Sequence, residues 1–90
     1  MKYFDWNVEK NVLLKAEREI SFEDVLVSIG EGKLLDILQH PNSKKYPNQK
    51  IFVVEINHYA YLVPFAENEQ TIFLKTIIPS RKATKDYIIK

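Results

Sequence analysis

The segment from Ser80 to Lys90 combines residue types that can bind a phosphate chain and transfer a proton to it. Its charged side chains are four cations, Arg81, Lys82, Lys85 and Lys90, and one anion, Asp86. The segment follows directly on an apolar run from Thr71 to Ile78, and it also contains the phenol of Tyr87. A buried strand leading into this segment can present cations to a phosphate while the phenol exchanges a proton. The alternatives are a charged helix start at Arg81 and Lys82 and a core aromatic at Tyr87.

A loop from Gln39 to Gln49 provides the second candidate group. It contains one histidine, His40, one tyrosine, Tyr46, the two lysines Lys44 and Lys45, and no acidic residue. Such a loop can hold a phosphate and place a proton donor, or it can be an ordinary solvated loop with a turn histidine. Lys75, in the apolar run, is either a solubilising surface charge or a further cation of the site.

Several classes of site are excluded by the residues that the sequence lacks. Gly30 and Gly32 are the only glycines, so a glycine-rich nucleotide-binding loop is excluded. There is no cysteine, and the two histidines, His40 and His58, do not have the spacing of a metal site. We therefore expect neither a metal ion nor a cofactor.

The length and composition predict one small globular domain spanning residues 1–90. The chain is 46% hydrophobic and 28% charged. The net charge is +1, but the charges are unevenly distributed along the chain: residues 1–36 are net acidic and residues 37–90 are net basic. A basic half can attract a polyanion, although small domains often show such asymmetry by chance. The sequence shows neither a signal peptide nor a membrane-spanning run, and the absence of cysteine fits a reducing compartment, so we expect a cytoplasmic protein.

Two helices are expected in the N-terminal third. Asn7 is a good N-cap for a helix from Val8 to about Glu17. The expected buried face of this helix consists of Val8, Val12 and Ala16, with Leu13 beside them. A second helix begins at a capping box formed by Ser21 and Asp24 and stops at Gly30.

The remainder of the chain has the character of β-strands. The expected extended segments are Lys33 to Leu38, Lys50 to Asn57, Tyr59 to Phe65 and Thr71 to Ile78. Asn57 and His58 form a short turn, and Pro64 should lie at a bulge or face an edge. In the last strand, alternation places Ile72, Leu74, Thr76 and Ile78 in the core and Lys75 on the open face.

These elements predict an α+β fold with two N-terminal helices packed on an antiparallel sheet and a short C-terminal helix. Tyr3 to Trp6 can add an edge strand, and Trp6 is expected to close the core at that edge. The C-terminal helix should be capped by Ser80 or Thr84. The candidate site then lies on the sheet face that the two N-terminal helices leave open.

Four stretches of the chain resemble the BrnT toxins of type II toxin–antitoxin systems. They are Phe4-Asp5-Trp6-Asn7, Glu9-Lys10-Asn11, Ile20-Ser21-Phe22-Glu23-Asp24-Val25 and Ile77-Ile78-Pro79-Ser80-Arg81-Lys82-Ala83-Thr84-Lys85. The family has an aromatic-rich start, a Lys-Asn pair that opens a helix, an Ile-Ser-Phe-Glu-Glu helix start and a terminal Arg-Lys-Ala-Thr. The order and spacing match over nearly the whole chain, and the Arg-Lys-Ala-Thr motif after a strand is the most specific part.

The resemblance implies a RelE-like fold and a metal-independent endoribonuclease that cleaves mRNA, with or without the ribosome. It also implies an antitoxin with a ribbon-helix-helix domain, covering a basic face formed by Lys44, Lys45, Arg81 and Lys82. The catalytic candidates are then Arg81, Lys82, His40, Tyr46 and Tyr87. The RNA-binding candidates are Lys44, Lys45, Lys75 and Lys85.

The sequence also departs from the family pattern. The family usually has Lys-His-Gly between the first two helices, whereas this chain has Lys15-Ala16-Glu17-Arg18-Glu19 and no histidine there. The chain therefore resembles a divergent subgroup. The missing histidine favours the alternative function, a non-catalytic RelE-like module that binds RNA or a protein partner.

Overall fold

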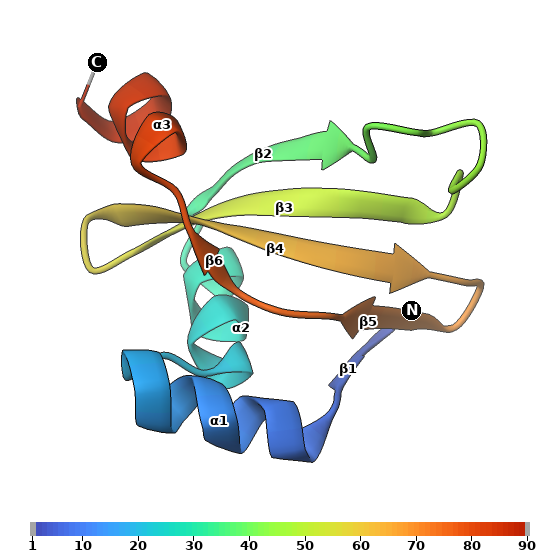
Figure 1. The fold of residues 1–90 in the computed structure, drawn as a ribbon, viewed down its shortest axis with the longest axis horizontal. Helices are drawn as coiled ribbons and strands as arrows, with labels where there is room; N and C mark the ends of the chain where they lie inside the picture. Colours follow the sequence, from blue (N-terminus) through green and yellow to red (C-terminus); the bar gives the residue numbers. More distant parts are fainter. Residues whose placement is uncertain (1, 90) are drawn as a thin grey trace.

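The computed structural model describes residues 2–89 as a mixed α+β domain (Figure 1). The first half contains strand β1 (Tyr3–Trp6), helices α1 (Val8–Arg18) and α2 (Phe22–Gly30), and strand β2 (Leu34–Gln39). The second half contains strands β3 (Gln49–Ile56), β4 (Tyr59–Glu67), β5 (Thr71–Leu74) and β6 (Ile78–Pro79), then helix α3 (Arg81–Ala83) and the π-helix η1 (Thr84–Ile89). We call α3 and η1 together the C-terminal helix. None of the described helices is long and apolar enough to cross a membrane.

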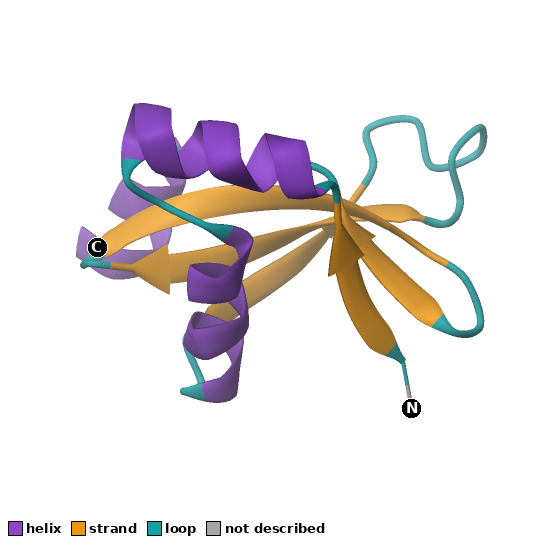
Figure 2. Ribbon diagram, turned by 90° about the horizontal axis from the view of Figure 1, so that it is seen from below, coloured by secondary structure: helices purple, strands orange, loops and turns teal. Residues whose placement is uncertain are grey.

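A six-stranded, mostly antiparallel sheet organises the domain. Its strand order is β1-β5-β4-β3-β2, and β6 pairs with β4 beyond the end of β5. Only β1 pairs in parallel, with β5, which confirms the expected N-terminal edge strand. Helices α1 and α2 lie on one side of the sheet and the C-terminal helix on the other (Figures 1 and 2). The predicted α+β class is therefore correct.

Local signals fix the helix starts and the tight turn. The Asn7 side chain accepts a hydrogen bond from the Lys10 amide, and Ser21 and Asp24 form both halves of a capping box. Asn57 and His58 both have positive φ, which is typical of the two-residue turn that joins β3 to β4. Helix α2 ends at Gly30 as expected, although Gly32 is the glycine that takes the left-handed conformation.

The expected buried face of α1 is wrong. Val8 and Val12 are 72% and 63% exposed, Leu13 and Ala16 are also exposed, and the only fully buried residue of the helix is Leu14. Polar contacts decide which side of the helix faces the core. The Asn11 side chain binds the Phe22 amide at 2.7 Å and the Glu23 carboxylate at 2.7 Å, and Arg18 donates to the Ile77 carbonyl at 2.6 Å. These contacts orient the Asn11–Leu14–Arg18 side inward.

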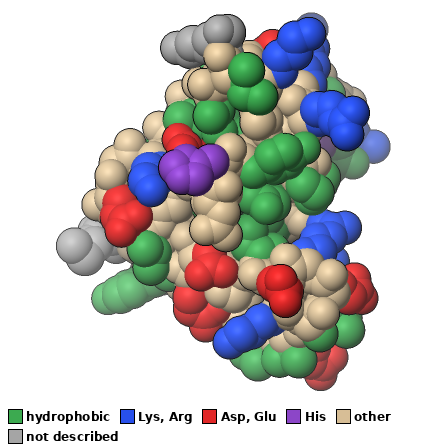
Figure 3. All heavy atoms as spheres, turned by 90° about the vertical axis from the view of Figure 1, so that its left-hand side faces the viewer, with side chains coloured by type: hydrophobic (Ala, Val, Ile, Leu, Met, Phe, Trp, Pro, Cys, Tyr) green, Lys and Arg blue, Asp and Glu red, His purple; other side chains and the backbone are tan. Residues whose placement is uncertain are grey.

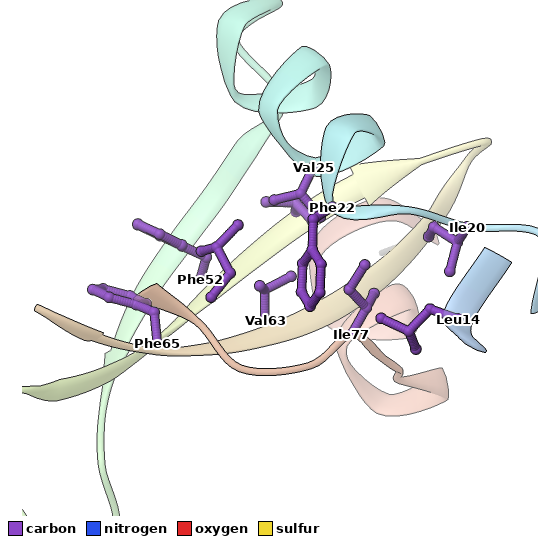
Figure 4. Close-up of a cluster of buried hydrophobic side chains, with 10 residues drawn as sticks. Leu14, Ile20, Phe22, Val25, Phe52, Val63, Phe65 and Ile77 are labelled. Atoms are coloured by element: carbon purple, nitrogen blue, oxygen red, sulfur yellow. The ribbon is translucent and has the colours of Figure 1, made fainter. Parts of the chain in front are cut away.

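The main core lies between the sheet and α2 (Figure 4). The Phe22 ring is fully buried and points between Val63 and Ile77. Trp6 stacks on Phe22 with ring centroids 5.6 Å apart, so its expected role of closing the core at the β1 edge is confirmed. The core therefore ties the N-terminal strand to the capping box of α2.

The last predicted strand is broken into two. β5 ends at Leu74, the Lys75 amide donates to the Pro64 carbonyl at 2.8 Å, and the chain rejoins β4 only at Ile78. Pro64 lies between the β4 residues that pair with β5 and those that pair with β6, because it has no N–H to donate there. The break shifts the alternation, so Ile77 is buried and Ile78 is exposed, contrary to prediction, and Thr76 is only half-buried. Lys75 is on the open face, as predicted.

The C-terminal helix covers one end of the second sheet face. Its Ala83 packs with Val53 and Ala60 of the sheet in a small second core, against which Leu62 and Tyr87 also lie. Within residues 2–89, no helix covers the rest of this face, and Phe73 is 39% exposed there. We call this partly covered side the open face.

Candidate nucleic-acid interface

The structure places the two candidate groups at opposite ends of the sheet. The C-terminal helix lies beside the β3–β4 turn, whereas the loop after β2 extends from the other end (Figures 1 and 2). Arg81, Lys82 and Tyr87 therefore form one group, and His40 and Tyr46 belong to another. The basic face expected from Lys44, Lys45, Arg81 and Lys82 is therefore divided between the two ends of the sheet.

The Arg81–Thr84 motif divides into an exposed half and a buried half. Ser80 caps the helix by accepting a hydrogen bond from the Ala83 amide at 3.1 Å. Ala83 is buried against the sheet. The buried Thr84 hydroxyl accepts from the Ala60 amide at 2.8 Å and donates to the Ser80 carbonyl at 2.8 Å. Ala83 and Thr84 thus fix the segment to β4, while Arg81 and Lys82 remain exposed to solvent.

We predict that Thr84→Val lowers the free energy of unfolding by about 1–3 kcal/mol, because the buried Ala60 amide loses its hydrogen-bond acceptor. Thr84→Ser keeps the hydroxyl and is the matched control, with a smaller loss. Urea denaturation of the two variants provides the comparison. Equal stability of the Val and Ser variants would show that the hydrogen bonds of the Thr84 hydroxyl do not fix the C-terminal segment to β4.

Three cations of the C-terminal helix are available to a ligand. Among residues 2–89, the side chains of Arg81, Lys82 and Lys85 take part in no hydrogen bond or ion pair. Lys90 lies outside the described residues. Figure 3 shows the end of the molecule with the C-terminal helix at the top, and the Lys and Arg side chains gather mainly at the top right. Most Asp and Glu side chains in this view lie in its lower half. The helix therefore presents a local excess of positive charge.

A tyrosine–aspartate pair joins the C-terminal helix to the edge strand. The Tyr87 hydroxyl donates to the Asp36 carboxylate at 2.6 Å. Asp36 was not a candidate from the sequence, because its position depends on a bulge. The register of β2 shifts between Leu34 and Asp36, which turns the Asp36 side chain to the open face opposite Val53. No local sequence signal marks this bulge.

The hydrogen bond moves the pKa values of its two partners in opposite directions. The Tyr87 hydrogen bond lowers the pKa of Asp36, and the Asp36 hydrogen bond raises the pKa of Tyr87. At neutral pH the phenol is therefore protonated and the carboxylate ionised. Tyr87 therefore carries a proton but donates it less readily than a free tyrosine, and Asp36 is a weak proton acceptor.

The same shifts predict how the pair contributes to stability with pH. The Asp36 contribution is present above the usual aspartate pKa and is lost as pH falls through the lowered pKa. The Tyr87 contribution is present below the usual tyrosine pKa and is lost as pH rises through the raised pKa. We expect Tyr87→Phe to reduce the pH dependence of the melting temperature in both outer ranges. Tyr3→Phe, at an exposed tyrosine, is the control. If the melting temperature depends on pH in the same way for Tyr87→Phe and for the unaltered protein, the Tyr87–Asp36 hydrogen bond does not contribute to stability.

A cleft of about 260 Å³ lies on the open face beside this pair. Its apolar floor comes from three adjacent strands and consists of Leu38, Val53 and Leu62. Its polar wall comes from the C-terminal helix and includes Lys82, Asp86 and Tyr87. The cleft thus brings one cation and one phenol of the candidate set beside an apolar surface.

The loop after β2 makes mainly local contacts. His40 Nδ1 accepts a hydrogen bond from the Asn42 amide at 2.9 Å, which stabilises the turn. The His40 and Tyr46 rings pack with centroids 4.7 Å apart, and the Lys45 ammonium lies 5.4 Å from the Tyr46 ring centre. Lys44 is exposed. The geometry favours the interpretation of His40 as a turn histidine, with the loop lysines available to a long polyanion.

Lys75 lies on the open face, directly after β5. Its ammonium donates to the Gln49 side chain at 2.8 Å, and Gln49 begins β3 directly after the loop. Lys75 therefore adds positive charge to the loop end of the open face rather than to the C-terminal helix.

The described residues contain no group of three or more His, Asp or Glu side chains that could hold a metal ion. Comparison of the chain with protein-family models, curated proteins and solved structures finds no match. A function can therefore be inferred only from the positions and chemistry of the residues described above.

Proposed function

We propose that this chain is the toxin of a type II toxin–antitoxin pair and a metal-independent endoribonuclease that cleaves mRNA in the cytoplasm and inhibits growth. The observation that carries the proposal is the anchored C-terminal segment. Ser80 and Thr84 hold it on β4, and it presents the exposed cations Arg81 and Lys82. Lys82 lines the same cleft as the phenol of Tyr87. The resemblance of the Arg-Lys-Ala-Thr stretch and of the earlier motifs to BrnT toxins supports the same class.

The proposed reaction is attack of a ribose 2′-hydroxyl on the adjacent phosphate. The 2′-oxygen forms a bond to phosphorus, the bond to the 5′-oxygen breaks, and the products are a 2′,3′-cyclic phosphate and a 5′-hydroxyl. Arg81 and Lys82 stabilise the negative charge that develops on the phosphate. Tyr87 gives its proton to the departing 5′-oxygen. Solvent takes the proton of the 2′-hydroxyl, because Asp36 lies 2.6 Å from the Tyr87 hydroxyl and therefore on the side of the departing oxygen.

Charge stabilisation supplies the larger share of catalysis in this site. A preorganised donor is worth about a hundredfold to a thousandfold in rate. A well-matched general base adds a comparable factor, but the low pKa of Asp36 makes it a poorly matched base near neutral pH. Arg81 and Lys82 are therefore the principal catalytic residues of the proposal.

The second candidate function is a binding module that does not cleave RNA. One observation favours it: the Tyr87 hydroxyl already donates a hydrogen bond to Asp36, and the other predicted proton-transfer residues, His40 and Tyr46, lie at the opposite end of the sheet. Such a module would bind RNA through the same cations without new RNA ends appearing. Mapping RNA ends separates the two functions.

The proposed partner is a small antitoxin of the ribbon-helix-helix type encoded beside this gene. Surface charge on the C-terminal helix would speed association, and apolar side chains of the open face would set the lifetime of the complex. The test is co-expression of the chain with the neighbouring gene. Growth arrest by the chain alone, relief by the neighbour and co-purification of the two support the pair. A harmless chain that purifies without its neighbour opposes it.

RNA cleavage should persist when divalent metal ions are removed, because the proposed reaction uses only Arg, Lys and Tyr side chains and solvent. Cleavage of a defined RNA is measured in the presence of excess EDTA, with a magnesium-dependent nuclease as the control that must lose activity. Complete loss of cleavage in EDTA followed by recovery on adding Mg²⁺ would contradict the mechanism.

A further inference from the structure

The cleft beside the C-terminal helix is lined by two side chains of opposite charge. Lys82 and Asp86 are one helical turn apart and line the same cleft, yet no ion pair joins them. A ligand can therefore meet the ammonium and the carboxylate separately. A simple anion would be attracted by Lys82 but repelled by Asp86.

The floor of the cleft is apolar. Val53 is fully buried, and Leu38 and Leu62 are partly open beside it. These residues belong to neighbouring strands, and the accessible parts of Leu38 and Leu62 provide the apolar surface under the polar wall. Such a surface suits the face of a planar ring. The ligand must then combine a phosphate for Lys82, a planar apolar ring for the floor and an N–H donor for Asp86.

We propose that this cleft binds the base of the RNA nucleotide next to the phosphate held by Arg81 and Lys82, and that Asp86 selects bases with an exocyclic amino group. The proposal rests on the proposed function, because it extends the same RNA site. A carboxylate accepts hydrogen bonds from the amino groups of cytosine, adenine and guanine, and guanine offers it two adjacent N–H donors. Uracil has no amino group, and its single N–H on this edge lies between two carbonyl oxygens, which a carboxylate repels.

The test is an NMR titration of the purified chain with the four ribonucleoside 3′-monophosphates and, separately, with inorganic phosphate. The signals observed are the Lys82 and Ala83 amides and the methyl groups of Val53 and Leu62. We expect the guanosine, adenosine and cytidine nucleotides to shift these signals, with guanosine binding about tenfold more tightly than uridine. Asp86→Asn should reduce this preference to less than about threefold, since the charge that discriminates is gone. Glu17→Gln, at an exposed carboxylate of α1, should leave it unchanged.

Three results would overturn the base site. Equal shifts from all four nucleotides and from inorganic phosphate would mean that only a phosphate binds. Shifts confined to other residues would mean that the nucleotides bind outside the cleft. A preference that survives Asp86→Asn would remove the role of Asp86. If any of these results is found and the chain still cleaves RNA in cells, the proposed function remains supported and only the base site is wrong. If the base preference is found but no RNA is cleaved, the base site is supported and the endoribonuclease function is wrong.

Discussion

Replacing Arg81 with alanine should reduce RNA cleavage about a hundredfold or more, which is the loss expected when one preorganised charge-stabilising donor is removed. Arg81→Lys should recover only part of the rate, because an ammonium cannot grip two phosphate oxygens as a guanidinium does. Arg81 is exposed and makes no side-chain hydrogen bond among the described residues, so the fold should remain intact. Cleavage rates and thermal melts of both variants are the measurements.

Lys15→Ala is the matched control for Arg81→Ala. Lys15 is also an exposed cation, but it lies on α1 on the other side of the sheet. Its removal should change stability by less than about half a kcal/mol and leave cleavage unaltered. If Arg81→Ala melts normally and retains full toxicity, the Arg81–Thr84 segment is only structural. The site would then have to be sought around Lys45, Tyr46 and Lys75.

The largest expected effect on stability follows from truncating Phe22. Its ring is fully buried, stacks with Trp6 and separates Val63 from Ile77. Phe22→Ala should therefore lower the free energy of unfolding by about 3–5 kcal/mol. The total free energy of unfolding of a small domain is roughly 5–15 kcal/mol, so the variant should be largely unfolded at moderately raised temperature. Denaturant titration measures the loss.

Val12→Ala provides the control for Phe22→Ala and tests the orientation of α1. Val12 belongs to the face that the apolar pattern predicts to be buried, but the structure leaves it exposed. Its truncation should cost less than about half a kcal/mol. A loss of several kcal/mol at Val12 would mean that α1 packs through the predicted face after all.

Elements with strong local signals were predictable from the sequence. The capping box of Ser21 and Asp24, the Asn7 cap and the Asn57–His58 turn are set by contacts within a few residues, and the structure contains all three. The orientation of α1 was not predictable in this way. It depends on Asn11 binding the start of α2 and on Arg18 reaching the Ile77 carbonyl, 59 residues away in the sequence.

The candidate site was predictable only in part. The residue types of the C-terminal segment indicated Arg81, Lys82 and Tyr87, and the structure places them on one helix. Asp36 could not be found, because a bulge in β2 and a contact across 51 residues bring it to Tyr87. The separation of His40 from Arg81 also depends on tertiary structure, since strand order and strand length decide which ends of the sheet the loops reach.

Mapping of RNA 5′ ends in cells that express the chain tests the central claim most directly. The comparison uses the unaltered chain, Arg81→Ala and Lys15→Ala, each with and without the neighbouring gene. We predict new 5′-hydroxyl ends within mRNA for the unaltered chain and Lys15→Ala, few such ends for Arg81→Ala, and none when the neighbour is co-expressed. Growth arrest without new RNA ends, or equal cleavage by Arg81→Ala at normal protein levels, would contradict an endoribonuclease site on the C-terminal helix.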